Sequence, residues 1–305
     1  MSRKRERLRV WLGSAAGIAL LACAEEPAPP PYGFASAEEQ RFRFEAEDKT
    51  TVDGTQVRVQ RYADVRLVAE SFEPRRTELV LYLDRYYIKV EGAPGGTTEL
   101  ALSERGLAVR GPGEEEFSLA PGDARPGGGT VAELRERPVA GCELGPDGEV
   151  AGTPWRSYDP ILSGIDLLDW ILLGFPVLGG AESNSWQARR TVPQLGQYKL
   201  GLELPLRYER VAGDGEGERI RVSGLVQRSS LSVAPNYTGA LNLDHLGQAE
   251  LGPAGRIREA QIELRMRFNA DSGGLVSSQH LVRIRSLDAD DSINSPSPAP
   301  DIFDE

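Results

Sequence analysis

Nucleophilic and acid–base chemistry in this sequence would have to use its two histidines or its internal cysteine, Cys142. A serine nucleophile needs a base beside it, yet no Gly-x-Ser-x-Gly elbow occurs, and Ser163 falls within an expected helix. Besides His245, only His280 could act as a base; its strand parity points it toward the core, as expected of a structural histidine. Cys142 adjoins a Gly-Pro-Asp-Gly turn and is expected to be a small buried hydrophobe. We therefore predict no catalytic residue and no enzymatic activity.

Two acidic runs carry the carboxylates that a ligand site would need. Glu114–Glu116 adjoins Gly and Pro and is expected to be a solvated loop, not the carboxylate pair of a glycosidase. Asp288–Ser292 lacks the glycine at position six and the acid at position twelve of an EF-hand loop. No phosphate-binding glycine loop or metalloprotease helix is present. The sequence predicts no metal and no cofactor, and it does not identify ligand-binding residues.

The N-terminus has the features of an export signal. Residues 1–9 are mostly basic, and the apolar stretch Val10–Ala22 is too short to span a bilayer as a permanent helix. The following Leu20-Leu21-Ala22-Cys23 resembles the lipobox of bacterial lipoproteins, in which the cysteine receives a diacylglycerol thioether. The resemblance implies lipidation of Cys23 and anchoring to a membrane; ordinary cleavage near Ala24, which would release the protein, is the alternative. Ala24 after the cysteine favours the outer membrane over the inner membrane.

Beyond the N-terminal segment, the hydrophobic pattern has the period of two that typifies β-strands. The clearest example is a hairpin that turns at Asp271–Gly274 and places apolar residues on one face: Ile262, Leu264, Met266, Phe268, Val276, Val282 and Ile284. Turn signals recur at short spacing, as at Asp53-Gly54. This pattern predicts a mainly β fold with antiparallel meander sheets.

One amphipathic helix is expected in the middle of the chain. Asp159 suits its N-cap, Pro160 its first turn, and Gly174 with Pro176 its end. An apolar stripe at helical spacing lies between them, formed by Ile161, Ile165, Leu168 and Leu172. We expect this helix to pack on the sheet and not to insert in a membrane.

Composition excludes several classes of protein. The 305 residues have a formal net charge of −11 and an apolar content typical of globular domains. The basic residues of the first 22 positions make the remainder still more acidic, which disfavours nucleic acid as a partner. Two Cys and two His are too few for a disulfide scaffold or an iron–sulfur site.

An internal echo suggests two related β halves. Residues 143–150 and 250–257 share the pattern Glu-Leu-Gly-Pro-x-Gly-x-aliphatic, typical of a turn between two strands. Coincidence is the alternative, because such turns are common. The segments Phe175–Leu178 and Ser185-Trp186, with the later Gly273-Gly274 turn, resemble an uncharacterised family of β-rich bacterial lipoproteins over the second half of the chain. That resemblance implies architecture and no site.

The sequence thus predicts a lipid-anchored envelope protein, on the periplasmic side or at the outer membrane, that acts as a non-enzymatic binding or interaction module. A half-barrel carrier of lipid or another apolar ligand, similar in outline to lipoprotein carriers, is the alternative. The expected division is a signal peptide (1–22), a Pro/Ala/Glu tether (23–37), an N-terminal β half (38–157), a central helix (158–175), a C-terminal β half (176–288) and a disordered acidic tail (289–305). The partners expected are the membrane, through the acyl chains, and an envelope protein or apolar ligand.

Overall fold

The computed structural model describes residues 32, 34, 38–73, 76–93, 96–111, 116–125, 127–159, 161–162, 166–179, 183–192, 202–211, 217–234, 237–287 and 302–303. The predicted signal peptide, the lipidation site Cys23 and the acidic run Asp288–Ser292 lie outside these residues, as do Glu114 and Glu115.

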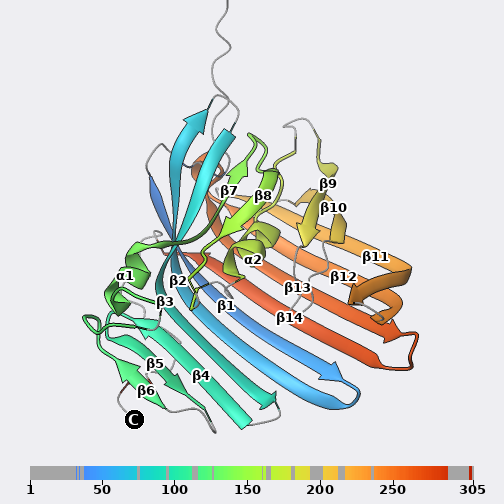
Figure 1. Ribbon diagram of the computed structural model, residues 1–305. Helices are drawn as coiled ribbons and strands as arrows, with labels where there is room; N and C mark the ends of the chain where they lie inside the picture. The colour runs from blue at the N-terminus through green and yellow to red at the C-terminus, as the bar shows by residue number, and fades with distance from the viewer. Residues whose placement is uncertain are drawn as a thin grey trace, which may run out of the picture.

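The described residues form one 14-stranded antiparallel sheet that is open, with two short helices, so the predicted mainly β meander is confirmed (Figure 1). The first strands are β1 (Glu39–Val52), β2 (Thr55–Glu73), β3 (Arg76–Ala93), β4 (Gly96–Ser103), β5 (Gly106–Arg110), β6 (Phe117–Leu119), β7 (Pro138–Leu144) and β8 (Val150–Arg156). The later strands are β9 (Ser185–Val192), β10 (Leu202–Val211), β11 (Glu218–Ala234), β12 (Tyr237–Leu251), β13 (Ile257–Ala270) and β14 (Leu275–Ser286). The helices are α1 (Val131–Glu136) and α2 (Leu167–Gly174), and Pro253–Gly255 forms a 3₁₀ turn.

The strand order is β6-β5-β4-β3-β2-β1-β14-β13-β12-β11-β10-β9, and the hairpin β7–β8 joins through β3. The β1–β14 pair connects the two predicted halves, with Phe44 opposite Ile284. Alternate residues of each long strand face the inner side, where they pack into one large hydrophobic core beneath α2 (Figure 1). The predicted β13–β14 hairpin is confirmed, with Ile262 opposite Val282 and both buried.

Strand β3 carries two different neighbours along one edge. Its segment Thr77–Tyr82 pairs with β7, whereas its segment from Tyr86 onward pairs with β4. Between them Asp84 is an extra residue in the ladder with β2, where Asp64 pairs with Arg85 and the next residue of β2 pairs with Leu83. The sheet therefore branches at Asp84, and the β7–β8 branch lies in front of the inner face while β4–β6 extend beside it (Figure 1).

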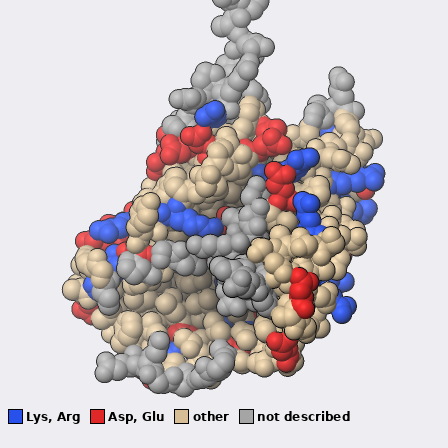
Figure 2. Space-filling model, turned by 45° about the vertical axis from the view of Figure 1, so that its right-hand side comes forward, with Lys and Arg blue, Asp and Glu red and all other residues tan. Residues whose placement is uncertain are grey.

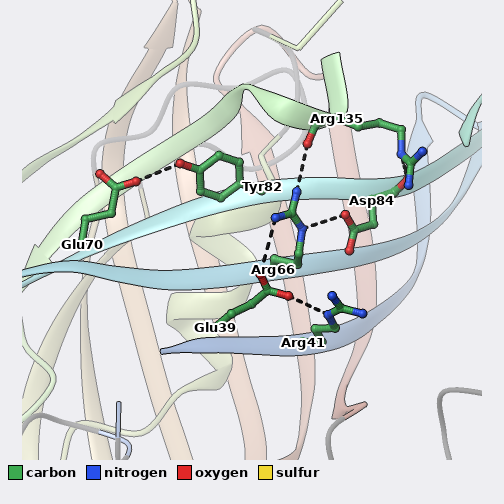
Figure 3. Close-up of polar contacts among 7 residues, drawn as sticks. All are labelled: Glu39, Arg41, Arg66, Glu70, Tyr82, Asp84 and Arg135. Carbon is green, nitrogen blue, oxygen red and sulfur yellow. Dashed lines mark hydrogen bonds and ion pairs between the residues drawn. The ribbon is translucent and has the colours of Figure 1, made fainter. Parts of the chain in front are cut away.

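The branch is fixed by Arg66 (Figure 3). Its Nε donates a 2.7 Å hydrogen bond to Asp84, and its Nη2 donates one of 3.0 Å to the carbonyl of Arg135 on α1. Its guanidinium also lies 5.1 Å from the centre of the Tyr82 ring. Arg135 in turn donates to the carbonyl of Asp84 at 2.9 Å. One bulged residue is thus held from β2 and from α1.

Helix α2 begins later than expected. Asp159 does not cap it; its carboxylate accepts from the backbone of Ile161 at 3.0 Å and lies 2.6 Å from Arg125, whose side chain is fully buried. These contacts fix a local turn that competes with helix formation, and α2 starts at Leu167 after Asp166. The end at Gly174 agrees with the expectation, and the helix packs on the inner face of the sheet. Among the described residues, no helix is long and apolar enough to cross a membrane.

Hydrophobic residues in the segments predicted to be a tether and a disordered tail pack against the sheet. Tyr32 and Phe34, within the expected tether, are buried in the main core. Ile302, in the expected tail, is buried with Tyr87, and Phe303 packs beside it. For these residues the structure differs from the expectation, because apolar side chains gain free energy by leaving water even in a polar segment.

The two predicted Gly-Pro-x-Gly turns have the same backbone bonds. Gly145 donates to the carbonyl of Glu149, and Gly252 donates to that of Arg256, both at 2.7 Å. Gly148 and Gly255 occupy the left-handed region, at φ of 79° and 74°. The predicted turn chemistry is confirmed at both places, while the duplication of the two halves stays a prediction.

Candidate functional site

One path of paired strands runs from β8 through β7, β3, β2, β1, β14, β13, β12, β11 and β10 to β9. Its two end strands, β8 and β9, lie on opposite sides of a pocket. Helix α2 forms the floor between them (Figure 1). We call this cavity of about 610 Å³ the seam pocket. It is lined by Glu149, Val150, Gly152, Thr153, Pro154, Asp169, Trp170, Leu172, Leu173, Gln187, Ala188, Arg189 and Arg190.

The seam pocket has the size and lining of a small-molecule site. Its volume falls within the range of roughly 300–1,000 Å³ that is typical of ligand pockets. Trp170, Leu172 and Leu173 supply an apolar floor from α2, and Val150 and Ala188 supply apolar side walls. Within the described sheet, β8 and β9 each pair on one side only, so both walls are strand edges.

A buried arginine, Arg190, forms part of the pocket wall. It is 4% exposed, and its guanidinium donates to the carbonyls of Gly148 and Phe175, both at 2.9 Å, and to the Tyr32 hydroxyl at 3.3 Å. Its Nε has no hydrogen-bond partner among the described residues. Burial raises the pKa of Tyr32 to about 12, so this hydroxyl is neutral at pH 7. The guanidinium therefore has neutral partners, although a buried charge without a counter-ion costs on the order of several kcal/mol.

The other charged residues around the seam pocket are paired or exposed. Asp169 forms an ion pair with Arg156. Burial raises the pKa of Asp169, and the charge of Arg156 opposes that shift. Arg189 pairs with Glu203 at 3.1 Å on the exposed side of β9. Over the face that Figure 2 shows, basic and acidic side chains are interspersed among the described residues. Recognition of a charged group here depends on individual side chains, not on a field of one sign.

A polar cluster lies under Trp170, the floor of the pocket. His280 Nδ1 lies 2.8 Å from the Asp48 carboxylate, and His280 Nε2 lies 3.1 Å from the Ser278 hydroxyl. Arg61 also forms an ion pair with Asp48. Burial alone would raise the pKa of Asp48, but the His280 hydrogen bond and the Arg61 charge outweigh it and hold that pKa below its usual value. The ring of Trp170 lies 5.2 Å from that of His280.

Ser278, His280 and Asp48 have the connectivity of a catalytic triad, which sequence reasoning did not anticipate. Acyl transfer also requires donors for an oxyanion. Ser278 lies in the middle of β14, which pairs with Thr50 on one side and with Met266 on the other, so the ladders use the neighbouring backbone amides. The arrangement fits a structural relay that satisfies buried polar groups. The prediction that His280 faces the core is confirmed.

His245 and Cys142 are both buried. His245 is fully buried on β12, and neither ring nitrogen has a hydrogen-bond partner among the described residues. Burial lowers its pKa to about 4. Burial raises the pKa of the Cys142 thiol to about 12, which agrees with the prediction of an unreactive side chain. These two side chains are not brought together with His280 at one site.

A second hollow, of about 730 Å³, lies on the outer face of the sheet. We call it the outer hollow; it spans β1, β2 and β11–β14 and is lined by outward-facing residues that include Glu47, Glu263, Arg221, Leu246 and Leu281. Leu246 and Leu281 are 46% and 39% exposed. The outer hollow is larger in volume than the seam pocket and lies on the solvent-facing side of the sheet.

No protein-family model matches the chain, and no curated protein matches it. The solved structures with a distant similarity include the following three. Lipovitellin, described for its lipid–protein interactions, is 11% identical with a TM-score of 0.48; the match covers 83% of this chain but only 25% of that one. The COG4313 outer membrane channel of Pseudomonas putida is 9% identical over 86% of this chain and 98% of that one, with a TM-score of 0.27. A DUF1329 family protein of Desulfovibrio piger is 8% identical over 79% and 84%, with a TM-score of 0.15. The likeness is therefore a distant one to β-rich proteins, two of them bacterial.

Sequence reasoning missed the residues of the seam pocket. Arg190 was a detectable signal, because it shares the parity of Trp186 and Ala188 on β9 and so points inward as a charged residue on an apolar face. The pairing of Tyr32 with Arg190 had no such signal, because 158 residues separate them.

Proposed function

We propose that the protein is a lipid-anchored component of the cell envelope that binds an elongated apolar ligand in the seam pocket. One observation favours the carrier interpretation over a general interaction module: the cavity of about 610 Å³ has an apolar floor from α2 and lies between β8 and β9. A binding role needs no reactive group, and the polar cluster near Trp170 serves to support the floor. The role proposed is binding and not catalysis.

Lipidation of Cys23 would hold this pocket close to a membrane. Tyr32 is nine positions after Cys23, and an extended chain of nine steps spans about 30 Å. The Tyr32 hydroxyl accepts a hydrogen bond from Arg190, which lines the pocket. An anchored protein would therefore keep the seam pocket within reach of the bilayer that supplies apolar ligands, and Ala24 favours the outer membrane as its place.

The test is ligand binding with the pocket filled. We expect the neutral fluorophore N-phenyl-1-naphthylamine to bind the wild-type protein, and Ala188→Trp, which places an indole in the wall, to weaken binding at least tenfold. Gln227→Trp, on the exposed side of β11, is the matched control and should bind like the wild type. Native mass spectrometry of membrane-extracted protein should show a co-purifying molecule that Ala188→Trp lacks. Equal binding by both variants would contradict the proposal.

The anchor has its own test. Cys23→Ser should move the protein from the membrane fraction to the soluble fraction, because loss of the acyl chains removes about 0.8 kcal/mol per buried methylene. Retention of the variant in the membrane fraction would exclude the lipid anchor while leaving the pocket proposal standing.

An interaction module remains the second candidate, favoured by the exposed leucines of the outer hollow. Its test is Leu246→Asp with Leu281→Asp. Loss of a crosslinked envelope partner, with unchanged binding of the fluorophore, would support this role, and an unchanged crosslinking pattern would argue against it.

A further inference from the structure

The geometry points to Arg190 as the group that selects the ligand: we propose that the seam pocket takes acyl chains with an anionic head group, a carboxylate or a phosphate, and that Arg190 binds that head group. The inference rests on the proposed function and names the class of ligand. The proposed binding group, Arg190, lines that cavity.

The first argument is the charge of Arg190. Its three hydrogen bonds go to two backbone carbonyls and a neutral phenol, which orient the guanidinium but do not neutralise it. The Tyr208 hydroxyl also interacts with the guanidinium and is a further neutral partner. A guanidinium presents its donors in a planar fork that matches carboxylate and phosphate oxygens. An anionic group at this wall would supply the missing counter-charge.

The second argument is that neighbouring charges do not compete for the same role. Asp169 is engaged by Arg156, and Arg189 by Glu203. Glu149 is an exposed residue of the lining, before the start of β8. Among the described residues that line the seam pocket, Arg190 is therefore the buried cation whose contacts include no carboxylate.

The third argument is the polarity of the cavity. Arg190 lies on β9, while Trp170, Leu172 and Leu173 form the floor from α2. One wall thus offers a charged group beside a continuous apolar surface. An amphiphile has the same division between head and chain, whereas a wholly apolar molecule would leave Arg190 unsatisfied.

The experiment compares ligands with equal chains. Oleate, 1-oleoyl-lysophosphatidate and 1-oleoylglycerol compete with N-phenyl-1-naphthylamine for the wild-type protein, at pH 7.5 and below their critical micelle concentrations. We expect at least one anionic ligand to displace the fluorophore at a tenfold lower concentration than 1-oleoylglycerol. The oleate and lysophosphatidate arms distinguish a carboxylate from a phosphate as the preferred group.

A charge variant tests the role of Arg190 without removing its structural bonds. Ala188→Glu places a carboxylate two residues away on the same strand face, about 7 Å along β9, and Ala188→Gln is the isosteric neutral control. Ala188→Glu should weaken the anionic ligand at least tenfold relative to Ala188→Gln, whereas the two variants should bind 1-oleoylglycerol with equal affinity. Far-UV circular dichroism verifies that both variants are folded.

The outcomes separate the two proposals. Equal displacement by all three ligands, or equal weakening of the anionic ligand by both variants, overturns the head-group inference and leaves the apolar-ligand function intact. Failure of the fluorophore and of all three ligands to bind the folded wild-type protein overturns the proposed function, and the inference with it.

Discussion

His245 tests how a buried, unpaired polar side chain affects the free energy of unfolding and its dependence on pH. Its ring is fully buried on the inner face, opposite Gly224 of β11 and Leu264 of β13, and both nitrogens have no hydrogen-bond partner among the described residues. The perturbation is His245→Leu, which replaces an unsatisfied polar ring with an apolar side chain. At pH 7.5 we expect the variant to be more stable by about 1 kcal/mol, because an unpaired buried polar group costs about 1–3 kcal/mol.

The larger effect depends on pH. Burial lowers the pKa of His245 from 6.5 to about 4. Below pH 6.5 the His245 ring is protonated in the unfolded chain but stays neutral in the folded protein. The stability present above pH 6.5 is therefore lost as the pH falls toward 4. At 1.36 kcal/mol per pKa unit, this loss is about 2 kcal/mol at pH 5 and about 3 kcal/mol near pH 4. His245→Leu should lack it.

The assay is urea unfolding followed by tryptophan fluorescence and circular dichroism at pH 7.5, 6, 5 and 4.5. The quantity compared is the free energy of unfolding of the variant minus that of the wild type. Asp48 and the other carboxylates are present in both proteins, so their titration cancels in this difference. A difference that stays constant from pH 7.5 to pH 4.5 would refute the reasoning.

Three further predictions concern other buried groups. Asp48→Asn should cost about 3–5 kcal/mol in the free energy of unfolding, because it leaves the largely enclosed guanidinium of Arg61 beside a neutral amide; a loss below 1 kcal/mol in urea unfolding would contradict this. Arg66→Leu should cost about 1–3 kcal/mol and increase hydrogen exchange in the β7–β8 hairpin more than in β13, because the clamp on Asp84 is lost; uniform exchange would contradict it. Cys142 should resist alkylation by iodoacetamide in the native protein at pH 8 and react in urea, since its pKa is raised to about 12; rapid native labelling mapped to Cys142 would contradict this.

The fold class was readable because period-two alternation is a local signal. The alternation of Ile262, Leu264 and Phe268 predicts both the strand and the face of it that is buried. The turns that contain Gly148 and Gly255 are specified by residues close in sequence. The start of α2 was misplaced because Asp159, a good N-cap by type, is held in a turn by Arg125, a contact that no local pattern reveals.

The site was less predictable because non-local contacts create it. The seam pocket depends on the pairing of β7 with β3 and on the position of β9 at the other end of the sheet. The pairing of β1 with β14 joins residues more than 200 positions apart, and no periodicity encodes such a partner. The inward parity of Arg190 was visible in the sequence, but its meaning depended on those contacts.

Because the sheet branches at β3, the width of the seam pocket can change without a change in the main sheet. The β7–β8 hairpin pairs with the long strands only through the ladder between β7 and Thr77–Tyr82 of β3, whereas β9, the opposite wall of the seam pocket, belongs to the main sheet. Adding or removing a residue pair in that hairpin would widen or narrow the pocket while the registers of β11–β14 stay as they are. Homologues with the same sheet are therefore expected to differ first in the length of the β7–β8 hairpin, and with it in the width of the ligands that they bind.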